Sequence, residues 1–171
     1  MSFKKDFWEK KIIGWEDGRY SLNHTKSDNL EIISDKLSSS LIHRQKIAIN
    51  ILKPFVKNNN IVELGCGSGL LAKTFLDLNC KSYTGYDISQ NAISRAKNIA
   101  KKNNFPDKIK FFASDIGKID ENNNTDLVFS LGLLDFLNND EIKKIFTHFN
   151  NSMHLHSISK YKKFNLYIFF H

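Results

Sequence analysis

The chain has 171 residues, of which 41% are hydrophobic, 25% are charged and two are cysteine, and its formal net charge is +7. This length allows one domain with a sizeable core, and the composition excludes a disordered chain, a disulfide scaffold and a membrane-spanning protein, which would need a longer apolar run. We therefore expect a reduced, cytoplasmic protein, since the charged start MSFKKDFWEKK also lacks the apolar stretch of a secretory signal peptide.

The first predicted elements are helical. From about Asp6 to Val56 the sequence indicates a helical N-terminal extension, whose last helix ends at Pro54. We assign residues 1–57 to a cap or lid segment and residues 58–171 to the core of the same domain. The aromatic residues of this extension either roof a pocket or pack on the sheet, and they are Trp8, Trp15 and Tyr20.

Five short apolar runs then alternate with segments of helical periodicity. The runs that we predict as strands are Ile61–Leu64, Ser82–Tyr86, Ile109–Phe112, Asp126–Ser130 and Met153–Ile158. Strand, helix and strand in series predict an α/β fold, namely a Rossmann-like, doubly wound parallel sheet with helices on both faces. We expect the first strand to be central, the first helices to lie on opposite faces, and a ligand to bind at the carboxyl ends of the strands.

Three glycines follow the first strand directly and open a helix, which is the context of a nucleotide-binding loop. They are Gly65, Gly67 and Gly69, in the stretch IVELGCGSGLLAKTF. A phosphate-binding loop would need glycine at the position of Ala72, and a dinucleotide fingerprint would need its third glycine at Leu70. Neither pattern is matched in full.

The stretch VELGCGSG at residues 62–69 resembles the first motif of class I S-adenosylmethionine-dependent methyltransferases. The resemblance continues in the family's order with GYDIS at residues 85–89, ASD at residues 113–115 and DLVFSLGLLDFL at residues 126–137. It extends from about residue 61 to residue 149. It implies the family's fold and a methyltransferase that uses S-adenosylmethionine and no metal.

The resemblance also implies roles for residues at the strand ends. Glu63 stands where the family has an acid near the methionine ammonium of the cofactor, and Asp87 stands where a carboxylate accepts hydrogen bonds from the ribose hydroxyls. Ile88 would pack on the adenine, and Asp115 and the amide of Ile116 would bind its polar edge. The full set of cofactor-binding candidates is Glu63, Gly65, Cys66, Gly67, Gly69, Asp87, Ile88, Asp115, Ile116, Ser130, Leu131 and, by its distance upstream, Arg44.

Plainer roles stay open for several of these residues. Asp87 and Asp115 could each cap the turn or helix that follows, and Arg44 could form a surface salt bridge. Cys66 is interpreted as a small filler of the loop rather than a nucleophile. His154 and His156 point the same way from a strand, but no nearby cysteine or carboxylate completes a metal site.

The segment after the fourth strand bears on the acceptor. SLGL at residues 130–133 lacks the Asn/Asp-Pro-Pro-aromatic motif usual in families that methylate adenine or glutamine nitrogen, so the resemblance favours a small-molecule, lipid or sugar acceptor. No catalytic residue is required, because the sulfonium methyl is already activated. Asp135 is the candidate for a base or a substrate contact, with a role at a helix start or in solvent as the alternative.

Three other functions stay open: a catalytically silent cofactor-binding or partner-binding domain, an RNA methyltransferase and an NAD-binding enzyme. The lysines are scattered without one long basic run and only three residues are arginine. We therefore expect a solvated basic surface and no nucleic-acid partner, although the charge of +7 leaves such a partner or an acidic membrane surface open.

The end of the chain departs from the family. Class I methyltransferases normally continue past strand five into a helix and a final pair of strands, but only KYKKFNLYIFFH, residues 160–171, follows here. That is too short, so we expect the final hairpin to be missing and the chain to be truncated. The fifth strand is then either an exposed edge, through which a homodimer would pair, or it is covered by the tail Phe164–Phe170.

Overall fold

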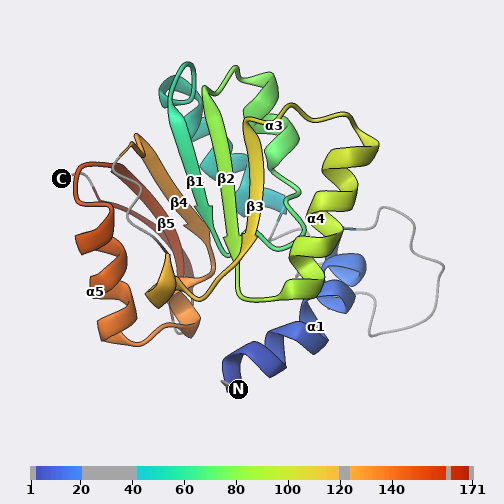
Figure 1. Cartoon of the computed structure of the whole chain (residues 1–171). Helices are drawn as coiled ribbons and strands as arrows, with labels where there is room; N and C mark the ends of the chain where they lie inside the picture. Colours follow the sequence, from blue (N-terminus) through green and yellow to red (C-terminus); the bar gives the residue numbers. More distant parts are fainter. Residues whose placement is uncertain (1–2, 21–41, 120–123, 161–162, 170–171) are drawn as a thin grey trace.

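A computed structural model describes residues 3–20, 42–119, 124–160 and 163–169 (Figure 1). These residues form a six-stranded sheet in the order β3-β2-β1-β4-β5-β6, with helices on both faces. Strands β1 to β5 are parallel, and β6 is antiparallel to β5. The prediction of a doubly wound α/β fold with β1 at its centre is confirmed.

All five predicted strands are present, and their ends lie within two residues of the prediction. The strands are β1 (Asn60–Leu64), β2 (Ser82–Asp87), β3 (Ile109–Ala113), β4 (Leu127–Leu131), β5 (Met153–Lys160) and β6 (Lys163–Phe169). The helices are α1 (Phe3–Tyr20), α3 (Ala72–Asp77), α4 (Gln90–Lys102) and α5 (Asn139–His148), and residues 42–52 are also helical. Short 3-10 turns are η1 (Lys53–Phe55), η2 (Ile116–Lys118) and η3 (Leu134–Phe136).

The sheet has an apolar core on each face, because successive residues of a strand point to opposite faces. In β4, Phe129 packs on the face covered by residues 42–52, α3 and α4, where the ring of Phe75 stacks on it at a centroid distance of 5.0 Å. The preceding residue, Val128, packs on the other face against Ile145 of α5. One strand thus contributes to both cores.

The prediction that the first helices lie on opposite faces is wrong. Phe75 of α3 and Ile93 of α4 belong to the same core, whereas Ile145 of α5 lies on the other face. The steps β1 to β2 and β2 to β3 run in one direction, so right-handed crossovers place both helices on one face. The helix changes face only after the chain returns to the other side of β1, which creates the switch point between β1 and β4.

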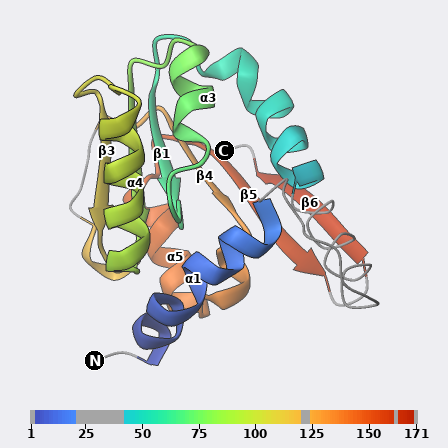
Figure 2. The same ribbon diagram turned by 90° about the vertical axis from the view of Figure 1, so that its right-hand side faces the viewer.

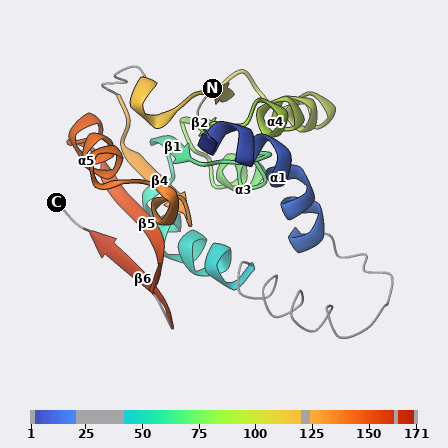
Figure 3. The ribbon, with the colours of Figure 1, turned by 90° about the horizontal axis from the view of Figure 1, so that it is seen from below.

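Helix α1 lies across the carboxyl ends of the strands, between α4 and α5 (Figure 2). Seen from below the sheet, it passes in front of the ends of β1 and β2 (Figure 3). The N-terminal extension is helical where the structure describes it, at residues 3–20 and 42–55. Residues 21–41 lie outside the described part, as do the side chains of Trp15 and Tyr20.

The outer edge of β5 is covered by the tail, which is the second of the two predicted arrangements. Strand β6 pairs with β5 from His154↔Phe169 to Lys160↔Lys163. An edge strand presents unpaired N–H and C=O groups, and β6 supplies partners for those of β5. In the part of the chain that is described, this antiparallel strand stands in place of the family's helix and strand pair.

Within the described ranges, none of the helices has the length and apolar character needed to cross a membrane.

Candidate functional site

The loop after β1, residues 65–69, is called here the glycine loop. Gly65, Gly67 and Gly69 have φ angles of 71°, 53° and 68°, in the left-handed region that other residues rarely adopt. The N–H groups of Gly65 and Cys66 donate to the carbonyl of Tyr86, at 2.8 and 3.0 Å. Backbone conformation therefore requires the glycines, and the loop is tied to the end of β2.

Protein atoms already lie against two of these glycines. A Cβ atom at Gly69 would overlap with the ring of Phe111, and one at Gly67 would overlap with the carboxylate of Glu16. The sequence pattern indicates a close approach to bare backbone. At these two positions the approach is made by the protein's own side chains.

Asp87 ends β2 and is buried beside the glycine loop. Its Oδ2 accepts from the N–H of Gly67 and its Oδ1 from the N–H of Ser89, each at 2.9 Å. Burial raises the pKa of Asp87, while these two amide hydrogen bonds oppose the rise. The cap of helix α4 is the hydroxyl of Ser89, so Asp87 joins the glycine loop to the turn that precedes the helix.

Glu63 is buried in β1 and accepts a hydrogen bond from the hydroxyl of Tyr83 in β2. Burial raises the pKa of Glu63 to about 8, and the carboxylates of Asp87 and Glu16 add to the rise. A positive charge nearby would favour the ionised form of such a group. The site therefore suits the ammonium contact that the resemblance implies.

Asp115 and Ile116 lie at the next strand end, after β3. The N–H of Ser114 donates to the carbonyl of Asp87 at 2.9 Å, which places this turn beside β2. Oδ1 of Asp115 accepts from the N–H of Gly117 at 3.1 Å and caps η2. The capping role is thus observed at Asp115, and the adenine contacts of Ile88, Asp115 and Ile116 stay predictions.

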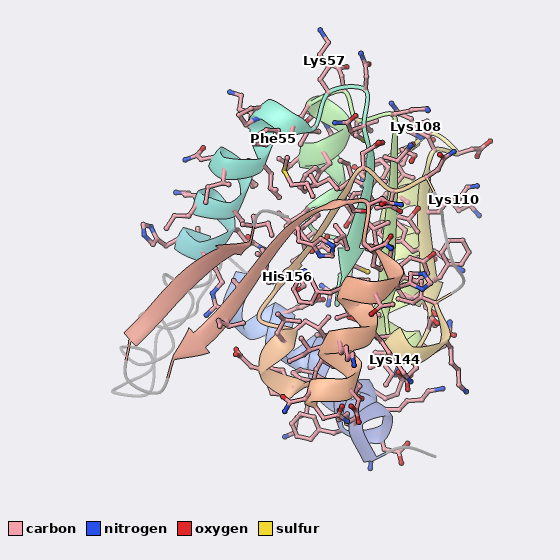
Figure 4. All side chains as sticks on the ribbon, turned by 90° about the vertical axis from the view of Figure 1, so that its left-hand side faces the viewer. Phe55, Lys57, Lys108, Lys110, Lys144 and His156 are labelled. Carbon is pink, nitrogen blue, oxygen red and sulfur yellow. The ribbon has the colours of Figure 1, made fainter. Side chains whose placement is uncertain are left out.

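Ser130 lies in β4 with its side chain on the α5 face. Its Oγ is 2.8 Å from Nδ1 of His156, Nε2 of His156 is 3.1 Å from Nδ1 of His154, and Nε2 of His154 is 2.9 Å from the carbonyl of Phe149. Figure 4 shows His156 between β5 and α5. Burial and the neighbouring His154 lower the pKa of His156 to about 3, so its ring is neutral near pH 7.

The carbonyl of Phe149 can only accept, so Nε2 of His154 donates to it. The donor in each of the other two contacts, His154 with His156 and His156 with Ser130, follows from the tautomers of the rings. The hydroxyl of Ser130 is therefore used within the core, and a cofactor contact at Ser130 would have to come from its main chain. The two histidines do point the same way, and the described residues contain no group of three His, Cys, Asp or Glu able to hold a metal ion.

Arg44 reaches the carboxyl end of β4 from the helical residues 42–52. Gly132, which follows Leu131 and has φ of 79°, lies against it: a Cβ atom there would be 2.9 Å from a guanidinium nitrogen of Arg44. Arg44 thus lies at the carboxyl end of β4, close to the candidates Ser130 and Leu131. Asp135 is exposed in the first turn of η3, just beyond.

Glu16 was not predicted from the sequence. It lies on α1, is only 7% exposed, and accepts hydrogen bonds from both the N–H of Ser68, at 2.8 Å, and the hydroxyl of Ser68. Burial raises its pKa, and Arg95 and the hydrogen bonds of Ser68 oppose the rise. The contact joins residues 52 positions apart, so no local pattern could have revealed it.

Comparison with known sequences gives two findings. A family model described as "Methyltransferase domain" matches residues 61–154. Ribosomal protein L11 methyltransferase of Haemophilus influenzae is 40% identical over 60 residues, which cover 35% of this chain and 20% of that protein. The same-named protein of a Shewanella species is 39% identical over 57 residues, again 20% of its length. The match therefore spans about a fifth of these curated relatives.

Two solved structures are similar over a larger part of the chain. Magnesium protoporphyrin IX methyltransferase of Synechocystis PCC 6803 with bound SAM aligns with a TM-score of 0.72 and 14% identity, over 97% of this chain and 77% of that one. An S-adenosylmethionine-dependent methyltransferase of Mesorhizobium loti aligns with a TM-score of 0.57 and 22% identity, over 67% and 52%. At these identities the likeness concerns the fold.

Proposed function

Because the chain belongs to the class I S-adenosylmethionine-dependent methyltransferases, whose domain model matches residues 61–154, we propose that it transfers a methyl group from that cofactor to a small-molecule, lipid or sugar acceptor. The bound cofactor supplies a sulfonium methyl group that a nucleophile can accept with little acid–base help. The chain then has three tasks: to bind the cofactor, to orient the acceptor and to exclude water.

The charged groups of the site fit this cofactor. Three buried carboxylates with raised pKa values surround the glycine loop, those of Glu16, Glu63 and Asp87. Such a set favours a ligand with positive charge and disfavours a phosphate. We assign the ammonium contact to Glu63, the ribose contact to Asp87 and the contact to the cofactor carboxylate to Arg44.

The proposed class of acceptor is supported by the position of α1, which lies over the carboxyl ends of the strands (Figure 2) and is called here the roof. At one end, Lys4 pairs with Glu141 of α5 at 2.6 Å, and the ring of Trp8 packs edge-on against Phe136 of η3 at 4.8 Å. A helix held across the strand ends restricts access to them and helps to exclude water from the reaction. A folded macromolecule is a poorer fit to such a covered site.

Helix α1 is attached to α4 as well. Oε1 of Glu9 accepts from the main-chain N–H of Asn91 at 3.1 Å. Phe7 and Phe136 are each 43% exposed, and Asp135, which precedes Phe136, is exposed as well. An aromatic rim with one carboxylate suits an acceptor that has an apolar body and a polar group, and we assign Asp135 to that contact.

The positive charge offers little support for an RNA acceptor. Lys57 and Lys108 precede β1 and β3, so they lie at the amino ends of the strands, away from the α1 roof (Figure 4). Lys108 also donates to the carbonyl of Cys80 at 2.8 Å. A protein acceptor is the second candidate, because the curated relatives are called ribosomal protein L11 methyltransferases, although the match covers only 20% of their length.

Labelling with S-adenosylmethionine that carries a radioactive methyl group tests the proposal. The protein is incubated with cell extract, which is then separated into small molecules, lipids, proteins and RNA, with Asp87→Ala protein as the control for background. Label in the small-molecule or lipid fraction is expected. Label in protein would support the second candidate, and label in RNA would contradict the proposal. If the protein bound the cofactor but labelled no product, the alternative of a catalytically silent cofactor-binding domain would be supported.

A further inference from the structure

Helix α1 faces the carboxyl ends of the strands with one side, and the first and last contact residues of that side are polar. Its contacts are made by residues spaced four apart, a spacing that places side chains on one side of a helix: Lys4, Trp8, Ile12 and Glu16. A helix built into a permanent core usually presents a continuous apolar stripe, but here only the middle of the face is apolar. Water can replace the polar end contacts, as is typical of elements that open locally.

Glu16 makes the contact of α1 with the glycine loop. Ser68, whose side chain is fully buried, donates to it with both its main-chain N–H and its hydroxyl. The charge of Arg95 also favours the ionised form of Glu16. Both donors of Ser68 are therefore used by a single residue of α1.

The carboxylate also lies directly on the main chain of the loop. Oε1 of Glu16 fills the space where a Cβ atom at Gly67 would stand, and the side chain of Ile12 lies next to it. The same Gly67 donates its N–H to Asp87, so Glu16 and Asp87 hold neighbouring atoms of one loop. Helix α1 cannot lift from the strand ends without breaking the contact of Glu16.

We propose that the hydrogen bonds from Ser68 to Glu16 act as a latch, which means that they hold α1 over the strand ends. The cofactor then enters and leaves the site only while Glu16 is separated from Ser68. This inference rests on the proposed function in one respect, namely that the glycine loop holds S-adenosylmethionine. In the closed state α1 covers the loop whether or not the cofactor is bound. Breaking the latch therefore speeds exchange in both directions.

Rapid filtration with radiolabelled S-adenosylmethionine measures the association and dissociation rate constants. Glu16→Ala and Ser68→Ala should each raise both constants roughly ten- to a hundredfold, the factor that corresponds to a hydrogen bond with a charged group. The double variant should be no faster than the faster single variant, because the two residues share one interaction. Asp6→Ala removes an exposed carboxylate of the same helix and should leave both constants unchanged.

Several outcomes would overturn the latch. A rise in the association constant alone would mean that Glu16 competes with the cofactor, and weaker binding through dissociation alone would make Glu16 a cofactor ligand. Unchanged association and dissociation rate constants in both Glu16→Ala and Ser68→Ala would show that the contact does not control cofactor exchange. Circular dichroism checks that the variants fold; should Glu16→Ala fail to fold, Glu16→Gln and Ser68→Ala carry the same test, with a smaller acceleration expected for the amide.

Hydrogen exchange without any cofactor separates this inference from the proposed function. Amides of residues 3–20 should exchange faster in Glu16→Ala than in the wild-type or Asp6→Ala protein. If the chain bound no S-adenosylmethionine, the proposed function would fail while this comparison still decided the latch. Equal exchange in all three proteins would overturn the latch even in an active methyltransferase.

Discussion

The N–H of Gly67 donates to Oδ2 of Asp87 at 2.9 Å, and this hydrogen bond joins the loop after β1 to the carboxyl end of β2. The other oxygen of Asp87 holds the N–H of Ser89. One buried carboxylate thus shapes two of the segments between which a ligand at the switch point must lie. The residue assigned to the ribose also organises the loop.

Asp87→Asn should weaken S-adenosylmethionine binding by about 1.5–3 kcal/mol, the scale of a hydrogen bond with a charged group. The amide has one accepting oxygen, so it cannot serve the N–H groups of both Gly67 and Ser89, and it lacks the charge that binds the ribose hydroxyls. Calorimetry measures the affinity. Asp77→Asn is the matched control, because Asp77 is an exposed partner of Lys73 on α3. Tight NAD binding in place of S-adenosylmethionine binding would contradict the assignment.

Arg44→Ala should also weaken S-adenosylmethionine binding by about 1.5–3 kcal/mol, since the guanidinium is assigned to the cofactor carboxylate. The affinity for 5′-methylthioadenosine, which has no carboxylate, should stay unchanged, whereas Asp87→Asn should weaken the binding of both ligands. Lys46→Ala, at an exposed position of the same helical segment, serves as the control. Equal losses for both ligands in Arg44→Ala would show that Arg44 acts on the structure of the site.

Gly67→Ala and Gly14→Ala should have opposite effects on α1. At Gly67 the φ of 53° and the contact with Glu16 make a side chain unfavourable, by roughly 1–3 kcal/mol for the backbone conformation alone. At Gly14, in the middle of α1, no atom lies within 4 Å of an added Cβ, and alanine favours the helix by up to about 1 kcal/mol. Hydrogen exchange of residues 3–20 should accelerate in the first variant and slow in the second. Equal exchange in both would refute the contact between α1 and the glycine loop.

His156 should favour the fold at neutral over acid pH, while Glu63, whose pKa is raised to about 8, contributes the opposite slope between about pH 4.5 and 8. Its pKa is lowered from 6.5 to about 3 in the fold, so below pH 6.5 the unfolded chain binds a proton that the folded chain does not. The contribution of His156 is present above pH 6.5 and is lost as pH falls toward 3, by roughly 1 kcal/mol per pH unit. Urea denaturation between about pH 7 and pH 5 measures the slope.

His156→Gln keeps one donor and one acceptor, and it should change the slope by roughly 1 kcal/mol per pH unit below pH 6.5, toward greater relative stability in acid, because the opposite contribution of Glu63 remains. His43→Gln, at an exposed position, should retain the slope of the wild-type protein. An unchanged slope in His156→Gln would show that another group is responsible.

Removal of residues 161–171 should make the protein associate. The deletion takes away β6 and exposes the ladder of β5 from His154 to Lys160, which can then pair with a second chain. Light scattering of the shortened and complete chains measures the mass. A shortened chain that stays a soluble monomer would show that β5 does not need its cover.

Several parts of this fold and site could be predicted because they depend on neighbouring residues. The period of the apolar residues identified all five parallel strands, and the strand-loop-helix context placed Gly65, Gly67 and Gly69 at a switch point. Asp87 was expected at the end of β2 and lies there, hydrogen-bonded to the glycine loop. For Ser130, the sequence identified the strand but not that its hydroxyl is used by His156.

By itself, the sequence determined the strands, their order along the chain and the glycine conformations, because periodicity and φ preference are properties of short segments. Only the tertiary structure decided that α3 and α4 share one face and that α1 crosses the strand ends. It alone brought Glu16 onto Ser68 and Lys4 onto Glu141, across 52 and 137 positions. Such contacts depend on where folding brings distant segments together, and no local pattern encodes that.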